Sequence, residues 1–334
     1  MRAIDRSTAC VLAAAALLFG CSQPSSGETA TPVAGTLHVA PDGAELDRTS
    51  FQMRLAAADV IYLGEQHGNR YHHAAQLRIV TDLVASGRKP AIGFEVVSLT
   101  QTSDLMNYVF APASDDAEAP ARRLRTELEW AADGEQWRDY GPLLEFARAN
   151  KLRVAGIDLT RGLRRRISRV GTQGLTEVER DQLYDTGFTD AAYREFMQGR
   201  LDEAHCGFAP PALLDRLYET WLTRNDAMMT VITTLAAERP GEPVVVIVGG
   251  GHVAHDMGVF ERVAHRAPHL RQLNIGFRGE QAGVSVPELF APVEVAGRRF
   301  GPIHEIIWLT PSAPGGAGAS PCAGLEEHMK KMGK

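Results

Sequence analysis

Six short apolar runs divide the chain, and most of them are apolar on successive residues and rich in β-branched side chains. Strands that are buried on both faces have this pattern. Between the runs, apolar residues recur at helical spacing, most clearly in 71–86 and from Leu213 to Leu235, before Pro240. Strands that alternate with helices predict an α/β fold with a mostly parallel central sheet and flanking helices. The runs cover residues 59–63, 90–94, 152–157, 243–248, 272–277 and 303–309.

Two segments between these runs are longer than an ordinary crossover connection. Residues 99–149 and 160–238 have helical patterns, and we expect them to form helical lobes over the C-terminal strand edge of the sheet. Together with the runs they predict one α/β domain over residues 46–310. Residues 21–45 are expected to be a flexible tether, and residues 311–334 a Gly/Pro-rich C-terminal tail.

The start of the chain has the features of an export signal. A basic segment precedes a small and apolar stretch, Ala9 to Gly20, which is too short to span a bilayer as a helix. The stretch ends in Leu18-Phe19-Gly20-Cys21, which resembles a bacterial lipobox. Residues 1–20 are therefore predicted to be a lipoprotein signal peptide, and Cys21 the lipidated first residue of the mature chain. Ser22 after the cysteine resembles the sorting pattern of lipoproteins in the Gram-negative outer membrane, facing the periplasm.

The charge of the chain limits its partners. The formal net charge is -6, and it becomes -7 once the signal peptide, with two arginines and one aspartate, is removed. A mildly acidic surface argues against nucleic acid as the partner. The membrane is therefore expected to be reached through the lipid anchor, since no second apolar stretch approaches membrane length.

Two cysteines, Cys206 and Cys322, remain in the mature chain besides Cys21. Export places both in an oxidising compartment, where a disulfide is the default expectation. We therefore predict a Cys206–Cys322 disulfide that ties the tail back to the helical lobe. The alternative is that Cys322 joins His328, Met329 and Met332 in a soft-metal cluster, for instance for Cu(I).

Two Gly-x-x-His tetrads follow apolar runs directly. They are Gly64-Glu65-Gln66-His67 and Gly249-Gly250-Gly251-His252, nearly two hundred residues apart. Ligands of an open α/β sheet bind outside the carboxyl ends of the strands, so both imidazoles should open onto one crevice. The pair predicts a site with two histidine ligands or bases.

Two further runs end in a carboxylate. Glu95 closes the run at 90–94, and Asp158 follows the run at 152–157, although Asp158 is as consistent with capping the next helix as with a role in the site. Gly249-x-Gly251-x-x-Ala254 mimics a dinucleotide fingerprint, but no acidic residue ends the next strand, so we reject that interpretation. Four strand ends with acidic or imidazole side chains predict a chemically active crevice.

These motifs resemble the ChaN-like haem-binding lipoproteins, which share a superfamily with the Tiki proteases and the erythromycin esterases. The resemblance spans roughly residues 55–310, and the separated motifs keep their order along the chain. The segments that carry it are Gly64-Glu65-Gln66-His67-Gly68-Asn69, His72-His73, Gly93-Phe94-Glu95, Trp137-x-x-Tyr140-x-Pro142, Gly156-Ile157-Asp158, Arg224-Asn225-Asp226-Ala227-Met228 and Gly249-Gly250-Gly251-His252.

The resemblance implies a haem-binding lipoprotein involved in iron acquisition, with haem held by Tyr and His, in one interpretation between the two subunits of a homodimer. Ferric haem favours a phenolate ligand with a histidine partner. Tyr140 is the first candidate and Tyr71, beside His72, the second, with His67 and His252 as the histidines, although buried packing is the commoner role of any tyrosine. Arg164-Arg165-Arg166 is consistent with propionate binding or with a solvated helix face.

A hydrolase is the alternative that the same residues leave open. His67, His252 and either Glu65 or Glu95 would bind Zn or another divalent metal and activate water, as the Tiki branch implies. Without metal, His67 could act alone as a general base, as the esterase branch implies. The lipobox and the order of the motifs favour haem.

Overall fold

The computed structural model describes residues 33–112, 115–185, 187–188, 190–280, 283–312 and 322. The predicted signal peptide and the lipidated Cys21 lie outside these residues, so both remain predictions. None of the helices in the described ranges is long and apolar enough to cross a bilayer.

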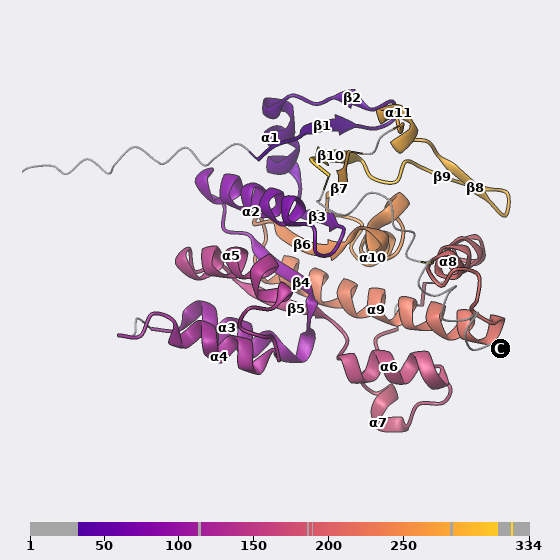
Figure 1. Cartoon of the computed structure of the whole chain (residues 1–334), viewed down its shortest axis with the longest axis horizontal. Coiled ribbons are helices and arrows are strands. Elements are labelled where there is room, and N and C mark those ends of the chain that lie inside the picture. The colour runs from indigo at the N-terminus through magenta and orange to yellow at the C-terminus, as the bar shows by residue number, and fades with distance from the viewer. Residues whose placement is uncertain are drawn as a thin grey trace, which may run out of the picture. The chain divides into compact units, whose positions relative to one another are not determined.

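An eight-stranded sheet forms the centre of the domain (Figure 1). Its spatial order is β2-β1-β10-β7-β3-β6-β4-β5. Every neighbouring pair from β10 to β5 is parallel, and only β1 pairs antiparallel, with β10 and with β2. The predicted α/β fold with a mostly parallel sheet is confirmed, and all six apolar runs contribute a strand. The strands are β1 (Thr36–Val39), β2 (Ala44–Glu45), β3 (Val60–Glu65), β4 (Ala91–Ser98), β5 (Val154–Asp158), β6 (Val244–Gly249), β7 (Gln272–Gly279) and β10 (Ile306–Thr310).

The two long helical patterns form helices close to their predicted bounds. The pattern at 71–86 gives α2 (Arg70–Ala85), whose N-cap is the Asn69 side chain. The pattern from Leu213 to Leu235 lies within α9 (Pro211–Glu238). The remaining helices are α1 (Arg48–Ala57), η1 (Leu99–Gln101), α3 (Thr102–Phe110), α4 (Ala119–Glu127), α5 (Glu135–Ala149), α6 (Arg161–Val170), α7 (Glu177–Arg180), α8 (Ala191–Ala204), η2 (Gly250–Asp256), α10 (Val259–Arg266) and α11 (Val286–Leu289).

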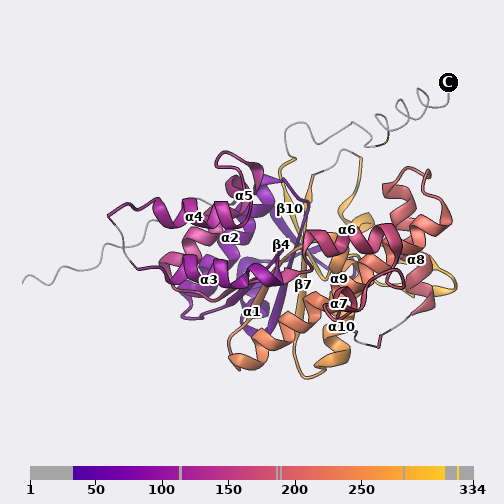
Figure 2. The same cartoon turned by 90° about the horizontal axis from the view of Figure 1, so that it is seen from below.

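Helices cover both faces of the sheet, as a parallel sheet requires. In Figure 2 the strands lie between the purple helices α2 to α5 and the orange helices α9 and α10. On the first face Ile79 of α2 and Leu144 of α5 are fully buried against the strands. On the second face Met228 and Ile232 of α9 and Val263 of α10 are equally buried. The two methionine side chains of α9, Met228 and Met229, are therefore core residues, as their helical spacing predicts.

Both long excursions are helical, as predicted, and in each one part packs on the sheet and another part lies beyond it. The C-terminal half of α9 packs on the sheet, whereas α6 and α8 pack against its N-terminal half. Figure 1 shows this half with α8 on one side and α6 on the other. Most of α3 and α5 also lies on a sheet face. Only the ends of these helices therefore stand over the C-terminal strand edge.

The predicted tether is too long at its C-terminal end. Residues 36–39 and 44–45 form β1 and β2, and β1 pairs with β10 along four residues. Only Leu37 of β1 is buried, so the segment has no apolar run that would predict a strand. A short hairpin, β8 (Val293–Val295) with β9 (Arg298–Phe300), escapes prediction for the same reason.

A disulfide joins Cys206 to Cys322, as predicted. It links the residue just beyond the end of α8 to the one tail residue after 312 that the structure describes. The sulfur of Cys322 is thereby engaged, which argues against its role in a soft-metal cluster. His328, Met329 and Met332, the other members of that alternative, lie outside the described residues.

Candidate functional site

A cleft of about 1100 Å³ opens at the carboxyl ends of the strands. Glu95 of β4 lies in its wall together with His67, which follows β3. The helical excursions supply the other walls, from Trp130 and Tyr140 on one side to Arg224 on the other. The predicted crevice is therefore present at the predicted edge of the sheet.

His67 presents its imidazole to this cleft. Its side chain is 55% exposed, whereas the Glu65 side chain beside it is 1% exposed. The His67 Nδ1 lies 2.8 Å from Glu65 Oε1, so the Nδ1 proton is donated to the carboxylate and Nε2 keeps its lone pair. The hydrogen bond to Glu65 raises the pKa of His67, although burial opposes the shift.

The Glu65 carboxylate is held from several sides. Gln76 Nε2 donates to its Oε2 at 2.6 Å, and the hydroxyl of Tyr140 donates to its Oε1. His73 Nδ1 lies 3.4 Å from Oε2. Burial and the negative charge of Glu65 raise the pKa of Tyr140 far above its usual range. The hydroxyl offered above as an iron ligand is therefore committed to Glu65 as a donor.

His72 and Tyr71 begin α2 but do not face the cleft together. His72 is fully buried, and its Nδ1 accepts the Gln66 backbone N–H at 3.0 Å while Nε2 meets the Asn69 amide at 3.0 Å. Burial lowers the pKa of His72 to about 4. The Tyr71 hydroxyl accepts from Arg70 at 3.0 Å, and neither residue lines the cleft. In this structure His72 holds the loop that carries His67 and is not itself an open ligand.

His252, at the end of the second tetrad, is buried. Its ring stacks on Trp221 of α9 with centroids 3.9 Å apart, and its Nδ1 donates to Asn225 Oδ1 at 2.8 Å. Its Nε2 lies 3.3 Å from Glu95 Oε1. Burial lowers the pKa of His252, and the positive charge of Arg224 adds to this effect. The imidazole is thus an enclosed group behind the cleft.

Arg224 joins the ends of two strands. Its guanidinium donates to Glu95 Oε1 at 2.5 Å and to Asp158 Oδ2 at 2.8 Å. Burial by itself would raise the pKa of Glu95, but His252 and Arg224 hold it well below its usual value. Thr160, not Asp158, caps α6, and Asp158 instead binds Arg224 and Arg164.

The two tetrads meet at Gly249. In the β3–β6 register Gly249 is the partner of Glu65. A Cβ at Gly249 would lie 3.0 Å from His67 Nε2 and 3.3 Å from Glu95 Oε2, and the Gly249 N–H donates to that same oxygen. A glycine is needed here because the space of a side chain is filled by the two functional groups.

The predicted metal set of Glu65, His67, Glu95 and His252 is not assembled as a donor cluster. Among the residues that the structure describes, no three His, Cys, Asp or Glu side chains are placed to hold a metal ion. The physical reason is the engagement of both carboxylates, since Arg224 occupies Glu95 while Tyr140 and Gln76 occupy Glu65. The metal set therefore stays a prediction that the described arrangement does not support.

The three arginines at 164–166 in α6 differ in their surroundings, so neither propionate binding nor a solvated helix face describes all of them. Arg164 and Arg165 both line the cleft, together with Arg161, while Arg166 pairs with Glu179. Arg164 is neutralised by Asp158 at 2.7 Å. Arg161 and Arg165 are exposed and have no ion pair within the described ranges. Two cations therefore face the cleft without a carboxylate partner.

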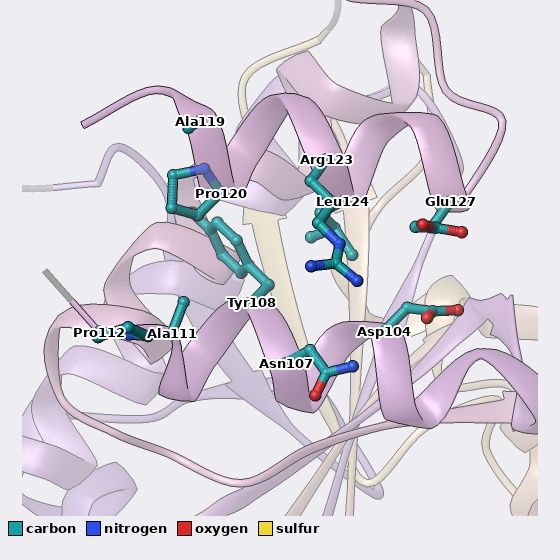
Figure 3. Close-up of a pocket in the computed structure, with 10 residues that line it drawn as sticks. All are labelled: Asp104, Asn107, Tyr108, Ala111, Pro112, Ala119, Pro120, Arg123, Leu124 and Glu127. Atoms are coloured by element: carbon teal, nitrogen blue, oxygen red, sulfur yellow. The ribbon is translucent and has the colours of Figure 1, made fainter. Parts of the chain in front are cut away.

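A second hollow lies between α3 and α4 (Figure 3). It has a volume of about 260 Å³ and contains Tyr108, Asp104 and Arg123 among its lining residues. The Arg123 guanidinium points between the two helices in this view. None of the site residues above lines this hollow, so it is separate from the candidate site.

Several residues that build the site were not predicted. Asn225, Trp221 and Gln76 act through hydrogen bonds or stacking, and the role of Arg224 as a bridge between strands was also missed. The signal was present in part, because Arg224-Asn225-Asp226 belongs to a segment that supports the family resemblance. Each of these three residues binds a different partner, and Asp226 binds Arg262 of α10 at 2.6 Å.

The chain is similar to several known proteins. A family model described as haem-binding uptake, Tiki superfamily, ChaN, matches residues 52–263. A ChaN protein of Campylobacter jejuni, described as binding haem cofacially, is 15% identical with a TM-score of 0.60, over 83% of this chain and 97% of that one. An erythromycin esterase mutant, EreC, in its open conformation is 13% identical with a TM-score of 0.47, over 80% and 95% of the two chains.

A curated relative, the chloroplastic Protein RETICULATA-RELATED 5 of Arabidopsis thaliana, is 23% identical over 289 residues. The match covers 80% of this chain but only 36% of that protein. The chain therefore spans about a third of the length of this relative.

Proposed function

Because the chain belongs to the ChaN family of haem-binding uptake proteins, in the Tiki superfamily, we propose that it binds haem in the cleft, with His67 as the ligand that it offers to the iron. The observation that carries this proposal is the state of one imidazole. His67 is exposed, Glu65 fixes its Nδ1–H, and its Nε2 is left as a lone-pair donor.

Such a pair is well suited to ligation. Histidines that bind metals usually donate the other ring N–H to a carboxylate or carbonyl, which fixes the tautomer and increases the basicity of the ligand. A histidine is a common axial ligand of haem iron. The cleft is at or above the upper end of the roughly 300–1,000 Å³ found for small-ligand sites, so a macrocycle has room.

The other candidate residues act around His67. Tyr140 and Gln76 hold Glu65, and His72 holds the loop after β3. His252 supports Glu95 from behind. We therefore assign Tyr140, His72 and His252 as positioning residues, and Tyr71, the more exposed of the two candidate tyrosines, as the remaining phenolate candidate. Arg161 and Arg165 supply the charge that haem propionates require.

Haemin titration tests the proposal. Wild-type protein is expected to give a saturable Soret shift, and His67→Ala to weaken haemin binding by about 100-fold. His269→Ala removes another exposed histidine far along the chain and is expected to leave binding unchanged. Tyr140→Phe should weaken binding less than His67→Ala does. A shift that survives in His67→Ala but is lost in Tyr71→Phe would transfer the ligand role to Tyr71.

We also propose that haem is shared between two copies of the chain. The support is the open face of the cleft at His67 and the cofacial haem binding described for the Campylobacter jejuni protein. Analytical ultracentrifugation with and without haemin tests this. A haemin-dependent shift from monomer to homodimer is expected, and a haem-loaded monomer contradicts it.

Lipid anchoring at Cys21 and a role in iron acquisition complete the proposal. The support is the lipobox together with a family described as haem-binding uptake. Cys21→Ser is expected to move the protein from the outer-membrane fraction to the soluble periplasm. A deletion strain is expected to lose growth on haemin as its iron source, and unchanged growth would count against uptake.

Hydrolysis remains the second candidate, in a form without metal. The observation in its favour is the carboxylate–imidazole pair Glu65–His67 beside an open cleft, an arrangement that also suits a general base. Ester hydrolysis by wild type that is lost in both His67→Ala and Glu65→Gln, without stoichiometric haem binding, would favour it.

A further inference from the structure

Arg278 is a largely buried cation without a counter-ion. It lies near the end of β7, where Leu309 of β10 is its register partner. In the described part of the chain its guanidinium has no hydrogen bond and no ion pair, and only its backbone carbonyl is used, by the Thr310 hydroxyl at 3.3 Å. Burial lowers the pKa of Arg278, and repulsion from Arg200 adds to the shift.

Three histidines interact with Arg278, and none of them offers it a negative charge. His72, His255 and His304 have lowered pKa values, in each case chiefly through burial and in part through the charge of Arg278. Asp256, an acid that interacts with His255, accepts a hydrogen bond from the Asn274 amide at 2.8 Å. A buried charge that lacks a partner is costly, and a bound anion would offset that cost.

Arg278 also lines a small cavity. It has a volume of about 220 Å³ and lies between the ends of β7 and β10 and α11. One part of its lining is polar, Arg278 and Glu280, and the other is aliphatic, with Val286, Leu289 and Leu309. It shares no lining residue with the cleft at His67.

We propose that this cavity binds a small monocarboxylate, whose carboxylate pairs with Arg278 and whose short alkyl chain lies against Val286, Leu289 and Leu309. An arginine fork matches the two oxygens of a carboxylate in a bidentate pair. Glu280 in the same lining repels a second negative charge, which disfavours phosphate and other dianions. A ligand with a few methylene groups gains affinity over a bare anion, because it buries them against the aliphatic wall.

Calorimetric titration with sodium hexanoate tests the proposal on the purified protein without haem. Saturable one-to-one binding is expected, at least tenfold weaker in Arg278→Met, which keeps the length of the apolar stem. Arg299→Met, the same change on the exposed part of β9, is the matched control and should bind hexanoate as wild type does. Equal binding by wild type and Arg278→Met, or no binding by wild type, contradicts the site.

Two further measurements separate a binding role from a structural one. Hexanoate should raise the Tm of wild type but not of Arg278→Met, and without hexanoate the variant should have the higher Tm, since the unpaired charge is gone. Leu289→Gln should weaken hexanoate binding more than acetate binding, and it carries the test if Arg278→Met does not fold. Inorganic phosphate that binds as tightly as hexanoate overturns the choice of a monocarboxylate.

Haemin titration of the same variants keeps this inference apart from the proposed function. Arg278→Met is expected to bind haemin within about twofold of wild type. Loss of hexanoate binding with normal haemin binding supports a second site. Parallel loss of both ligands would instead place Arg278 in the haem site and overturn the inference.

Discussion

The two Gly-x-x-His tetrads occupy equivalent places and behave in opposite ways. They end neighbouring parallel strands, and Glu65 of the first is the register partner of Gly249 in the second. Yet the His67 side chain is 55% exposed and the His252 side chain is 4% exposed. The pKa of His67 is raised by its hydrogen bond to Glu65, and that of His252 is lowered by burial.

The difference comes from what lies over each strand end. Above β6, α9 places Trp221 against the ring of His252 and Asn225 against its Nδ1. Above β3, the cleft is open, and the short hydrogen bond of His67 within the described residues is to the Glu65 carboxylate beneath it. A motif at a strand end thus sets the position of a side chain, while elements distant in sequence decide whether it is exposed or buried.

Arg224→Met is expected to show how much the stability of the buried side of the site, around Glu95 and His252, depends on α9. The substitution leaves Glu95 buried without its arginine, while Asp158 keeps Arg164, and breaking a buried ion pair costs about 3–5 kcal/mol. Urea unfolding measures the loss. Arg165→Met, at the open front, should change the free energy of unfolding by less than about 0.5 kcal/mol. Equal losses in the free energy of unfolding for the two variants would contradict the distinction between the open side of the site, at His67, and the buried side, at His252.

Lowering the pH is expected to destabilise the folded protein through His72, which holds the loop that carries His67. Its pKa in the folded state is about 4, against 6.5 for the unperturbed group. Because the pKa of this histidine is lowered in the folded state, the folded protein loses stability as the pH falls through this window, by about 3 kcal/mol between pH 6.5 and pH 4. His72→Gln should remove this part of the slope in unfolding curves measured across that range. Parallel curves for wild type and variant would show that His72 is not the group responsible.

Glu65→Gln sharpens the comparison without removing the imidazole. Loss of the carboxylate behind a ligating histidine costs about 10–100-fold in metal affinity, and haemin binding should weaken by that factor. Trp221→Phe perturbs the cover of His252 instead and is the control, with binding expected within about threefold of wild type. The comparison fails if the control loses as much affinity as Glu65→Gln.

Haem binding is expected to depend on pH through His67. Only the neutral imidazole can ligate, and the pKa of His67 lies above 6.5 because of Glu65. Haemin affinity should therefore fall up to about tenfold per pH unit as the pH drops below that pKa, and level off above it. In Glu65→Gln the midpoint should move to lower pH. A midpoint that does not move would mean that another group controls binding.

The sequence predicted the sheet and the edge at which chemistry occurs, because both depend on local patterns. Apolar runs identify buried strands, and a polar residue at the end of a parallel strand lies at the carboxyl edge wherever the strand falls in the sheet. β1 escaped because a single buried residue, Leu37, makes no pattern.

The partners within the site could not be predicted in the same way. Asn225 and His252 are 27 residues apart, and Tyr140 and Glu65 are 75 apart, so their hydrogen bonds depend on how α9 and α5 dock on the sheet. The ion pair of Glu95 was missed for this reason, since Arg224 binds a carboxylate that the sequence left free. The Cys206–Cys322 disulfide was predictable because few pairings were available.

Imidazole rescue tests most directly the claim that the exposed tetrad supplies the ligand. His67→Gly leaves an open cavity beside Glu65, and His252→Gly does the same behind the cleft. We predict that millimolar imidazole restores the wild-type Soret spectrum of haemin-loaded His67→Gly, whereas His252→Gly binds haemin with the wild-type spectrum and shows no response. A His67→Gly protein that retains the wild-type spectrum without imidazole, or rescue seen only in His252→Gly, would contradict the account.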